Sequence, residues 1–181
     1  NNKVKTGNEV PGQEKQFRDL ISRYPDSLLL KENLVQYFRD KGNYEQAITE
    51  TTIVLNKDSL NSRFLDIKAT LLFENGDTIN AIKAFEKAIS IDPRSGYIIS
   101  LGSLYAQTKN PMALVLADSL LQRPGNVQKE AIFIKGLYFS YKGDKIKAIA
   151  FFNSCLNMDY RDMLAYREKA ICLYDLNKYA T

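Results

Sequence analysis

The chain has 181 residues, of which 45% are hydrophobic and 25% are charged, and its 25 basic and 21 acidic side chains give a formal net charge of +4. Opposite charges are interspersed along the sequence, whereas nucleic-acid-binding proteins gather Lys and Arg on one face, so we expect no nucleic-acid partner. The chain contains no histidine. This excludes Ser-His-Asp and Cys-His hydrolysis, histidine-ligated zinc and a histidine general base for the chain acting alone.

Nucleotide-binding glycine motifs are also missing, since neither a Walker loop nor a dinucleotide fingerprint occurs. We therefore predict no catalytic residues, no metal site and no cofactor, and we expect that the protein is not an enzyme.

Residues 1–13 are polar, lack apolar periodicity and include Pro11-Gly12, so we predict a flexible leader. No segment is apolar over about 15 to 20 residues, and no membrane span is expected. A polar start such as Asn1–Lys5 often follows the lipidated cysteine of a bacterial envelope lipoprotein, and it equally remains when a domain is trimmed. The first interpretation predicts a periplasmic, lipid-anchored protein of the bacterial envelope, and the alternative is a cytoplasmic location.

Residues 14–27 are predicted to form a capping helix that ends at Pro25, with Phe17, Leu20 and Ile21 on one face. The chain beyond this segment repeats itself. Three similar turns begin with glycine at 42–48, 76–82 and 143–149, and the first two lie 34 residues apart. The third follows the second by 67 residues, one less than two periods. A repeat of this length predicts a stack of identical helical units.

We place the repeats at about 28–61, 62–94, 95–128, 129–162 and 163–181, with the last one truncated after its first helix. Each repeat is predicted to contain a first helix, a turn and a second helix. The third repeat departs most from the pattern, because Lys109-Asn110-Pro111 replaces the glycine turn. Asn110 as N-cap with Pro111 at the first helical position still predicts a helix start there.

At these positions the chain resembles the tetratricopeptide repeat family. The second repeat carries the later part of the family pattern and the third carries the earlier part, and the matching residues are Gly76-Asp77, Ala81, Phe85, Ala88 and Asp92-Pro93, then Leu101-Gly102 and Tyr105. The resemblance implies an all-α, right-handed superhelical solenoid of antiparallel helix pairs. It also implies a concave groove, lined mainly by the first helix of each repeat, that binds a protein or peptide.

Counting along each first helix gives the side chains that are expected to point into the groove: Glu32, Gln36, Arg39, Arg63, Asp66, Thr70, Phe73, Ile99, Ser103, Phe133, Leu137, Tyr141, Arg167, Ile171 and Tyr174. The lining changes from charged to aromatic along the chain, which suits a peptide with an apolar anchor. The residues that we predict to contact the partner are Arg63, Phe73, Phe133, Leu137, Tyr141, Arg167 and Tyr174. The same aromatic residues could instead be covered by the missing half of the fifth repeat.

One use of the family is argued against by the sequence. Family members that clamp the terminal carboxylate of heat-shock chaperones place Lys, Asn and Arg at set positions of their first helices. The matching positions here hold Glu32, Gln36, Ile67, Gly96 and Ser100. We therefore do not expect a carboxylate-clamp partner, because a glutamate repels a carboxylate.

Our leading prediction is a non-enzymatic scaffold or adaptor that binds a protein or peptide in the groove. The alternative is a structural spacer or self-assembly segment of a longer repeat protein, which associates through the C-terminal repeat. Cys155 and Cys172 occupy apolar positions in helices that are expected to be neighbours. A disulfide between them is conceivable, but two buried thiols fit the pattern better.

Overall fold

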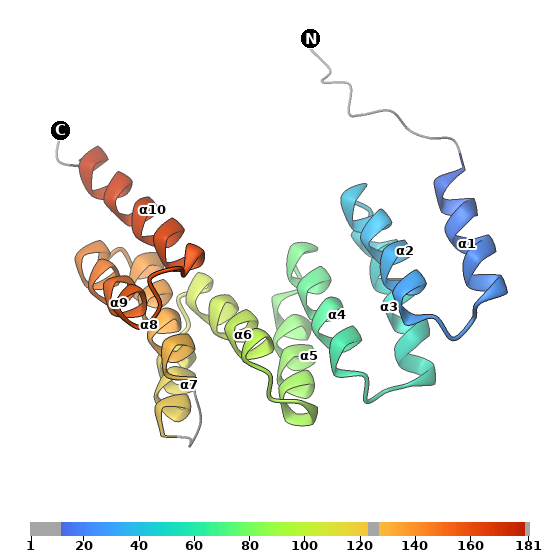
Figure 1. Ribbon diagram of the computed structural model, residues 1–181, viewed down its shortest axis with the longest axis horizontal. Helices are drawn as coiled ribbons and strands as arrows, with labels where there is room; N and C mark the ends of the chain where they lie inside the picture. The colour runs from blue at the N-terminus through green and yellow to red at the C-terminus, as the bar shows by residue number, and fades with distance from the viewer. Residues whose placement is uncertain (1–11, 123–126, 180–181) are drawn as a thin grey trace, which may run out of the picture. The chain divides into compact units, whose positions relative to one another are not determined.

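The computed structural model describes residues 12–122 and 127–179, and these ranges are helical without a strand (Figure 1). The predicted all-α fold class is confirmed. The helices of the described residues are α1 (Gln13–Arg23), α2 (Leu28–Asp40), α3 (Tyr44–Lys57), α4 (Ser62–Glu74), α5 (Thr78–Ile91), α6 (Ser95–Gln107), α7 (Met112–Leu121), α8 (Gln128–Lys142), α9 (Lys145–Met158) and α10 (Met163–Tyr179).

Two predictions concern residues that the structure does not describe. The predicted leader, 1–13, lies outside the described residues except for Gly12 and Gln13. Residues 1–5, on which the envelope prediction rests, lie outside them as well. No described helix has the length and the apolar character that a membrane crossing requires.

The helix starts follow the period of the sequence. Helices α2, α4, α6 and α10 begin at the first residue of a proposed repeat, and α8 begins one residue ahead of the fourth. The turn before α9 shows how these starts are specified. Gly143 has a φ of 95°, in the left-handed region that favours glycine. Asp144 then caps α9 by accepting a 3.0 Å hydrogen bond from the backbone N–H of Lys147.

The start of α7 uses different residues for the same purpose. Lys109 takes the place of the turn glycine and has a φ of 55°, which costs a non-glycine residue about 1 to 2 kcal/mol. The side chain of Asn110 accepts a 3.0 Å hydrogen bond from the backbone N–H of Met112. Pro111 already has helical backbone angles, although the regular helix begins one residue later than predicted, at Met112.

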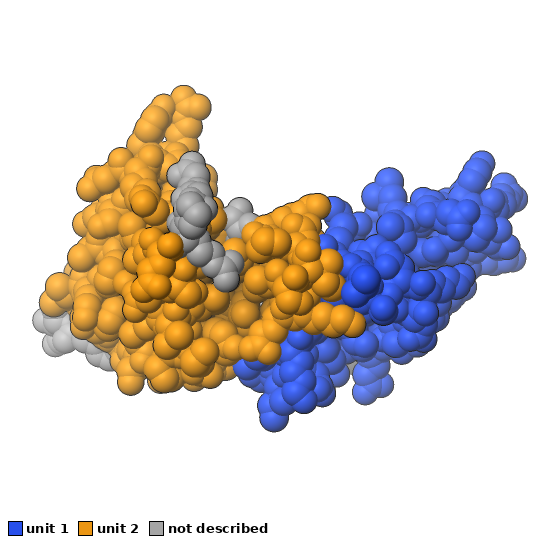
Figure 2. Space-filling model, turned by 90° about the horizontal axis from the view of Figure 1, so that it is seen from below, with its two compact units in different colours: residues 1–84 blue, residues 85–181 orange. Residues whose placement is uncertain are grey.

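The described chain divides into two compact units, residues 1–84 and 85–181, and the boundary falls within α5 (Figure 2). In unit 1, helix α3 packs on both α2 and α4, and α1 packs on α2. Its core cluster is formed by Leu34, Val35, Phe38, Ala47 and Leu71. These side chains come from α2, α3 and α4, so the three helices share one core.

In unit 2, helix α8 is central and packs on α6, α7 and α9. The close approach of α8 and α9 depends on Gly136, because a Cβ atom at this position would lie 2.6 Å from the ring of Phe152. Helix α10 packs mainly on α9. An ion pair of 2.7 Å between Lys145 and Asp175 also joins these two helices.

Candidate functional site: the surface between α2 and α4

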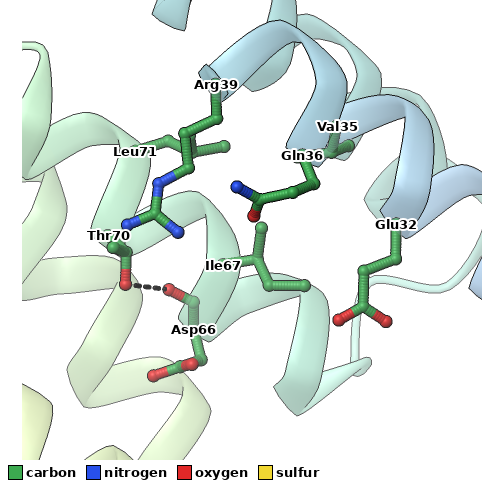
Figure 3. Close-up of a pocket in the computed structure, with 8 residues that line it drawn as sticks. All are labelled: Glu32, Val35, Gln36, Arg39, Asp66, Ile67, Thr70 and Leu71. Carbon is green, nitrogen blue, oxygen red and sulfur yellow. Dashed lines mark hydrogen bonds between the residues drawn. The ribbon is translucent and has the colours of Figure 1, made fainter.

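Unit 1 has a cavity of about 180 Å³ between the first helices of two successive repeats, α2 and α4. In Figure 3 Gln36 and Arg39 extend from α2 toward α4, whereas the carboxylate of Asp66 points away from α2. The cavity is lined by Glu32, Val35, Gln36, Arg39, Asp66, Ile67, Thr70 and Leu71. We refer to these residues together as the α2–α4 surface.

Two ion pairs connect α2 to α4. The guanidinium of Arg63 binds both carboxylate oxygens of Glu32 through its Nε, at 3.1 and 3.0 Å, and its Nη2 lies 2.7 Å from Oε1. Arg39 binds both oxygens of Glu74, with 2.8 Å between Nε and Oε2. The hydrogen bond to Glu74 raises the pKa of Arg39. Such partly exposed pairs each contribute up to about 1 kcal/mol to stability, but their forked geometry fixes the side chains.

Polar side chains lie above an apolar floor within this surface. The floor includes Val35 and Leu71, both of which are buried in the core cluster. The amide of Gln36 donates a 2.6 Å hydrogen bond to Asp40. The hydroxyl of Thr70 donates a 3.1 Å hydrogen bond to the backbone carbonyl of Asp66. A ligand here would therefore meet an amide, a hydroxyl, the Asp66 carboxylate and apolar side chains, since the neighbouring arginines are engaged by carboxylates.

In unit 1, Asp66 has a carboxylate whose pKa clearly departs from its ordinary value. Burial raises the pKa of this carboxylate to about 6, and the nearby charge of Arg63 opposes the rise. One carboxylate oxygen, Oδ1, is buried and has no hydrogen-bond partner among the described residues. Because an ionised carboxylate is costly to bury, we expect Asp66 to lower the stability of unit 1 at neutral pH.

A second cavity of about 320 Å³ lies on the other side of α2, against α1. The rings of Phe17 and Tyr37 contribute to its wall with their centroids 6.1 Å apart, and the ammonium of Lys41 lies 5.7 Å from the ring centroid of Tyr37. Gln36 lines both cavities. Unit 1 therefore offers a polar cavity and a more aromatic one on the two sides of a single helix.

The residues predicted to contact a partner lie in different environments. In unit 1, Arg63 borders the α2–α4 surface through its ion pair with Glu32, and Phe73 is half-buried on α4. In unit 2, Tyr141, Arg167 and Tyr174 are exposed. Two further residues of unit 2, Phe133 and Leu137, lie in the core.

The burial of these two residues has a clear structural cause. The side chain of Phe133 is 6% exposed, and its ring centroid lies 5.7 Å from that of Phe152. Leu137 is equally buried in the same helix, α8. Both residues therefore present little surface to a partner in this structure.

Sequence reasoning placed Glu32, Gln36, Arg39, Asp66 and Thr70 among the inward-pointing side chains, and all five line the α2–α4 surface. It did not identify the cavity beside α1, which requires knowing that the capping helix leaves space next to Tyr37. The sequence signal for this cavity was the apolar face of the capping helix, which includes Phe17.

Cys155 and Cys172 are free and buried. Burial raises the pKa of the Cys155 thiol to about 12, so the reactive thiolate is scarce at neutral pH. The thiol of Cys172 lies 3.3 Å from the hydroxyl of Ser140. The two residues act as small core side chains, and no disulfide joins them in this structure.

Paired helices at a fixed period, with side chains of successive first helices sharing a surface, define an α-helical repeat protein. The family model described as tetratricopeptide repeat matches residues 62–95 and 130–162. The chain therefore contains tetratricopeptide repeats, as the pattern of its turns and helices predicts. A search of curated protein sequences found no match to the chain.

Solved structures with a similar fold include a tetratricopeptide repeat protein from Parabacteroides merdae, at 23% identity and a TM-score of 0.68 over 92% of this chain and 67% of that chain. The C-terminal part of a repeat-containing protein from Cytophaga hutchinsonii matches at 18% identity and a TM-score of 0.62, over 88% of this chain and 63% of that one. YrrB, described as having an unusual peptide-binding site, matches at 18% identity and a TM-score of 0.57, over 91% and 86%. At these low sequence identities, the structural similarity shows a shared fold and nothing about a shared function.

Proposed function

We propose that the protein is a non-enzymatic scaffold that holds a protein or peptide partner on the α2–α4 surface. The cavity between α2 and α4 carries this proposal, because it combines an apolar floor with fixed polar groups on rigid helices. Tetratricopeptide repeats typically mediate protein interactions, and the same fold carries a peptide-binding site in YrrB.

The chemistry of the surface indicates the kind of contact. Because Arg39 and Arg63 are bound by carboxylates of the chain itself, the surface is poorly suited to an anionic group. Gln36 and Thr70 offer amide and hydroxyl groups that suit a peptide backbone. The neighbouring cavity beside Phe17 and Tyr37 suits an apolar side chain of the same peptide.

Of the residues predicted from the sequence, Arg63 and Phe73 lie on α4 and belong to this proposal. The exposed side chains of Tyr141, Arg167 and Tyr174 form a separate proposed contact region on unit 2. Phe133 and Leu137 are buried in the core of the same unit and are not part of this region.

A peptide-display selection against the protein tests the proposal. Selected peptides are titrated calorimetrically against the wild type and the Gln36→Ala variant, which removes a side chain common to both cavities. We expect binding to weaken about tenfold, the value of roughly one lost hydrogen bond. Gln107→Ala is the matched control, because this exposed glutamine lies at the end of α6. Equal affinities for the wild type and Gln36→Ala would contradict the proposal.

A second function, self-assembly, is favoured by one observation. Several large apolar side chains of the last helix, α10, are exposed, and Tyr174 reaches 69%. Scattered exposed apolar residues are normal, but a concentration on one helix indicates an interaction surface.

A further inference from the structure

The charges at the α2–α4 surface do not balance. Two arginines border the cavity, and a carboxylate of the facing helix binds each of them. Glu32 binds Arg63, and Glu74 binds Arg39. Asp66 also lines the cavity, and it belongs to neither pair. Because each pair is neutral, the carboxylate of Asp66 leaves one negative charge of the lining uncompensated.

The surroundings of Asp66 make this charge costly to keep. Its Oδ1 is buried and has no hydrogen-bond partner among the described residues. Arg63 acts on the carboxylate through its charge, and burial outweighs that effect, so the pKa of Asp66 is raised. Charged groups held where they destabilise the fold are characteristic of functional sites, because such groups serve a ligand rather than stability. Asp66 is therefore a candidate contact for a ligand of opposite charge.

The polar groups near Asp66 are also able to accept hydrogen bonds. The amide nitrogen of Gln36 donates to Asp40, which leaves its carbonyl oxygen as an acceptor. The hydroxyl of Thr70 donates its hydrogen to the backbone carbonyl of Asp66, which leaves its lone pairs. A carboxylate, an amide carbonyl and a hydroxyl whose hydrogen is already used suit a group that only donates. The charged ends of Lys and Arg side chains are such groups.

The apolar part of the cavity selects for a long side chain. In Figure 3 Ile67 lies between Asp66 and α2, and Val35 adds to the apolar floor. A side chain that enters between α2 and α4 therefore crosses apolar surface before it reaches the carboxylate of Asp66, which is half-buried. Lys and Arg cover such a surface with their apolar stems and keep the charge at the far end. A metal ion fits less well, because the described residues contain no group of three side chains that could ligate it.

We propose that the partner places one basic side chain, of Lys or Arg, on the α2–α4 surface, with its stem on Ile67 and its charged end against Asp66. The charge of this side chain is complementary to that of the site, and its binding compensates a carboxylate that is otherwise costly to bury. The proposal rests on the function proposed above and specifies the chemistry of the partner's contact residue.

Calorimetry with peptides selected by display tests the proposal. The peptides are synthesised with acetylated N-termini, so that a terminal amine cannot supply the charge, and each basic residue is replaced in turn by methionine. One replacement should weaken binding to the wild type about tenfold and leave binding to Asp66→Asn unchanged. Glu45→Gln, which removes an exposed carboxylate of α3 outside the α2–α4 surface, is the matched control and should bind every peptide like the wild type.

The stability of Asp66→Asn separates a binding role from a structural one. This variant should bind the unmodified peptides about tenfold more weakly than the wild type and yet unfold at a higher urea concentration. Structural damage would instead lower both affinity and stability. The methionine replacement is made in the peptide, so its effect on binding to the wild type can be measured even if Asp66→Asn does not fold.

Two results would overturn the proposal. One is that the selected peptides contain no basic residue, or that replacing their basic residues leaves binding to the wild type unchanged. The other is that a replacement weakens binding to the wild type and to Asp66→Asn equally. If such peptides still lose affinity for Gln36→Ala, the α2–α4 surface holds the partner without using Asp66. Equal affinities for the wild type and Gln36→Ala would instead contradict the proposed function itself.

Discussion

The first helices of the two units use the same repeat position differently. In unit 1, α2 and α4 direct Gln36 and Thr70 into a cavity and pair their charges across it. In unit 2, α6, α7 and α9 surround α8, so Leu137, which holds the same repeat position as Gln36 and Thr70, is a core side chain. Position within a repeat therefore specifies the direction of a side chain, and the helices that surround it decide whether it remains accessible.

The largest expected difference concerns two phenylalanines in the same register. Phe152→Ala removes a completely buried ring between packed helices and should lower the free energy of unfolding by about 3 to 5 kcal/mol. Phe17→Ala removes a half-buried ring from α1 and should lower the free energy of unfolding by about 1 to 2 kcal/mol. Urea unfolding followed by circular dichroism measures both. Equal losses would mean that α1 is as firmly packed as α9.

Two glycines within helices of unit 2 sharpen the same comparison between core and surface. Gly136→Ala forces a Cβ atom against the ring of Phe152 and should destabilise the protein by about 1 to 3 kcal/mol. Gly96→Ala, at a position in α6 with nothing within 4 Å, should be neutral or stabilise by up to about 1 kcal/mol, because alanine favours the helix. The same urea titration measures both variants, and a stabilising Gly136→Ala would show that the helices are not closely packed at this point.

Replacing Asp66 should show how much its buried carboxylate in the α2–α4 surface destabilises the protein. Because burial raises the pKa of its carboxylate, Asp66→Asn should stabilise the protein at pH 7. The shift corresponds to about 3 kcal/mol, and partial exposure reduces our expectation to about 1 to 2 kcal/mol. Thermal or urea unfolding at pH 7 measures the difference, and a destabilised variant would contradict this account of Asp66.

The pH dependence of the same variant provides a control. The pKa of Asp66 is about 6 in the folded protein, against an ordinary value of 3.8. As the pH rises from about 4 to about 6, the unfolded chain loses this proton before the folded protein does, so the contribution of Asp66 to stability falls. The advantage of Asp66→Asn over the wild type should grow across this range and stay constant above it. An advantage that is the same at pH 4 and pH 7 would exclude ionisation as the cause.

The smallest expected effect concerns the ion pair of Arg39 with Glu74. A double-mutant cycle with Arg39→Gln and Glu74→Gln should give a coupling energy below about 1 kcal/mol, because both side chains are partly exposed. Unfolding at low and high salt measures the coupling and its screening. A coupling of about 3 kcal/mol would instead assign the pair a major role in holding α2 on α4.

Much of the fold follows from local signals in the sequence. Turns with a glycine and a capping side chain, such as Gly143-Asp144, specify both the end of one helix and the start of the next. At the start of α7 a capping Asn110 is sufficient even though Lys109 replaces the glycine. These signals act within a few residues, so they can be recognised without knowledge of tertiary packing.

The candidate site depends on contacts that local signals do not specify. The inward direction of Gln36 and Thr70 follows from helical periodicity, and the structure places both in the cavity. The burial of Phe133 depends on Phe152, which is 19 residues away and reaches it only after α8 and α9 pack. The cavity beside Tyr37 likewise exists only because α1 packs on α2.

A methyl NMR titration with a peptide selected by display tests most directly whether the α2–α4 surface holds the partner. The methyl signals of Ile67 and Val35 are expected to shift on binding, because both line the α2–α4 surface, while those of Ile171 and Leu173 on α10 are not. Shifts confined to α10, with Ile67 and Val35 unchanged, would contradict the proposal that the α2–α4 surface holds the partner.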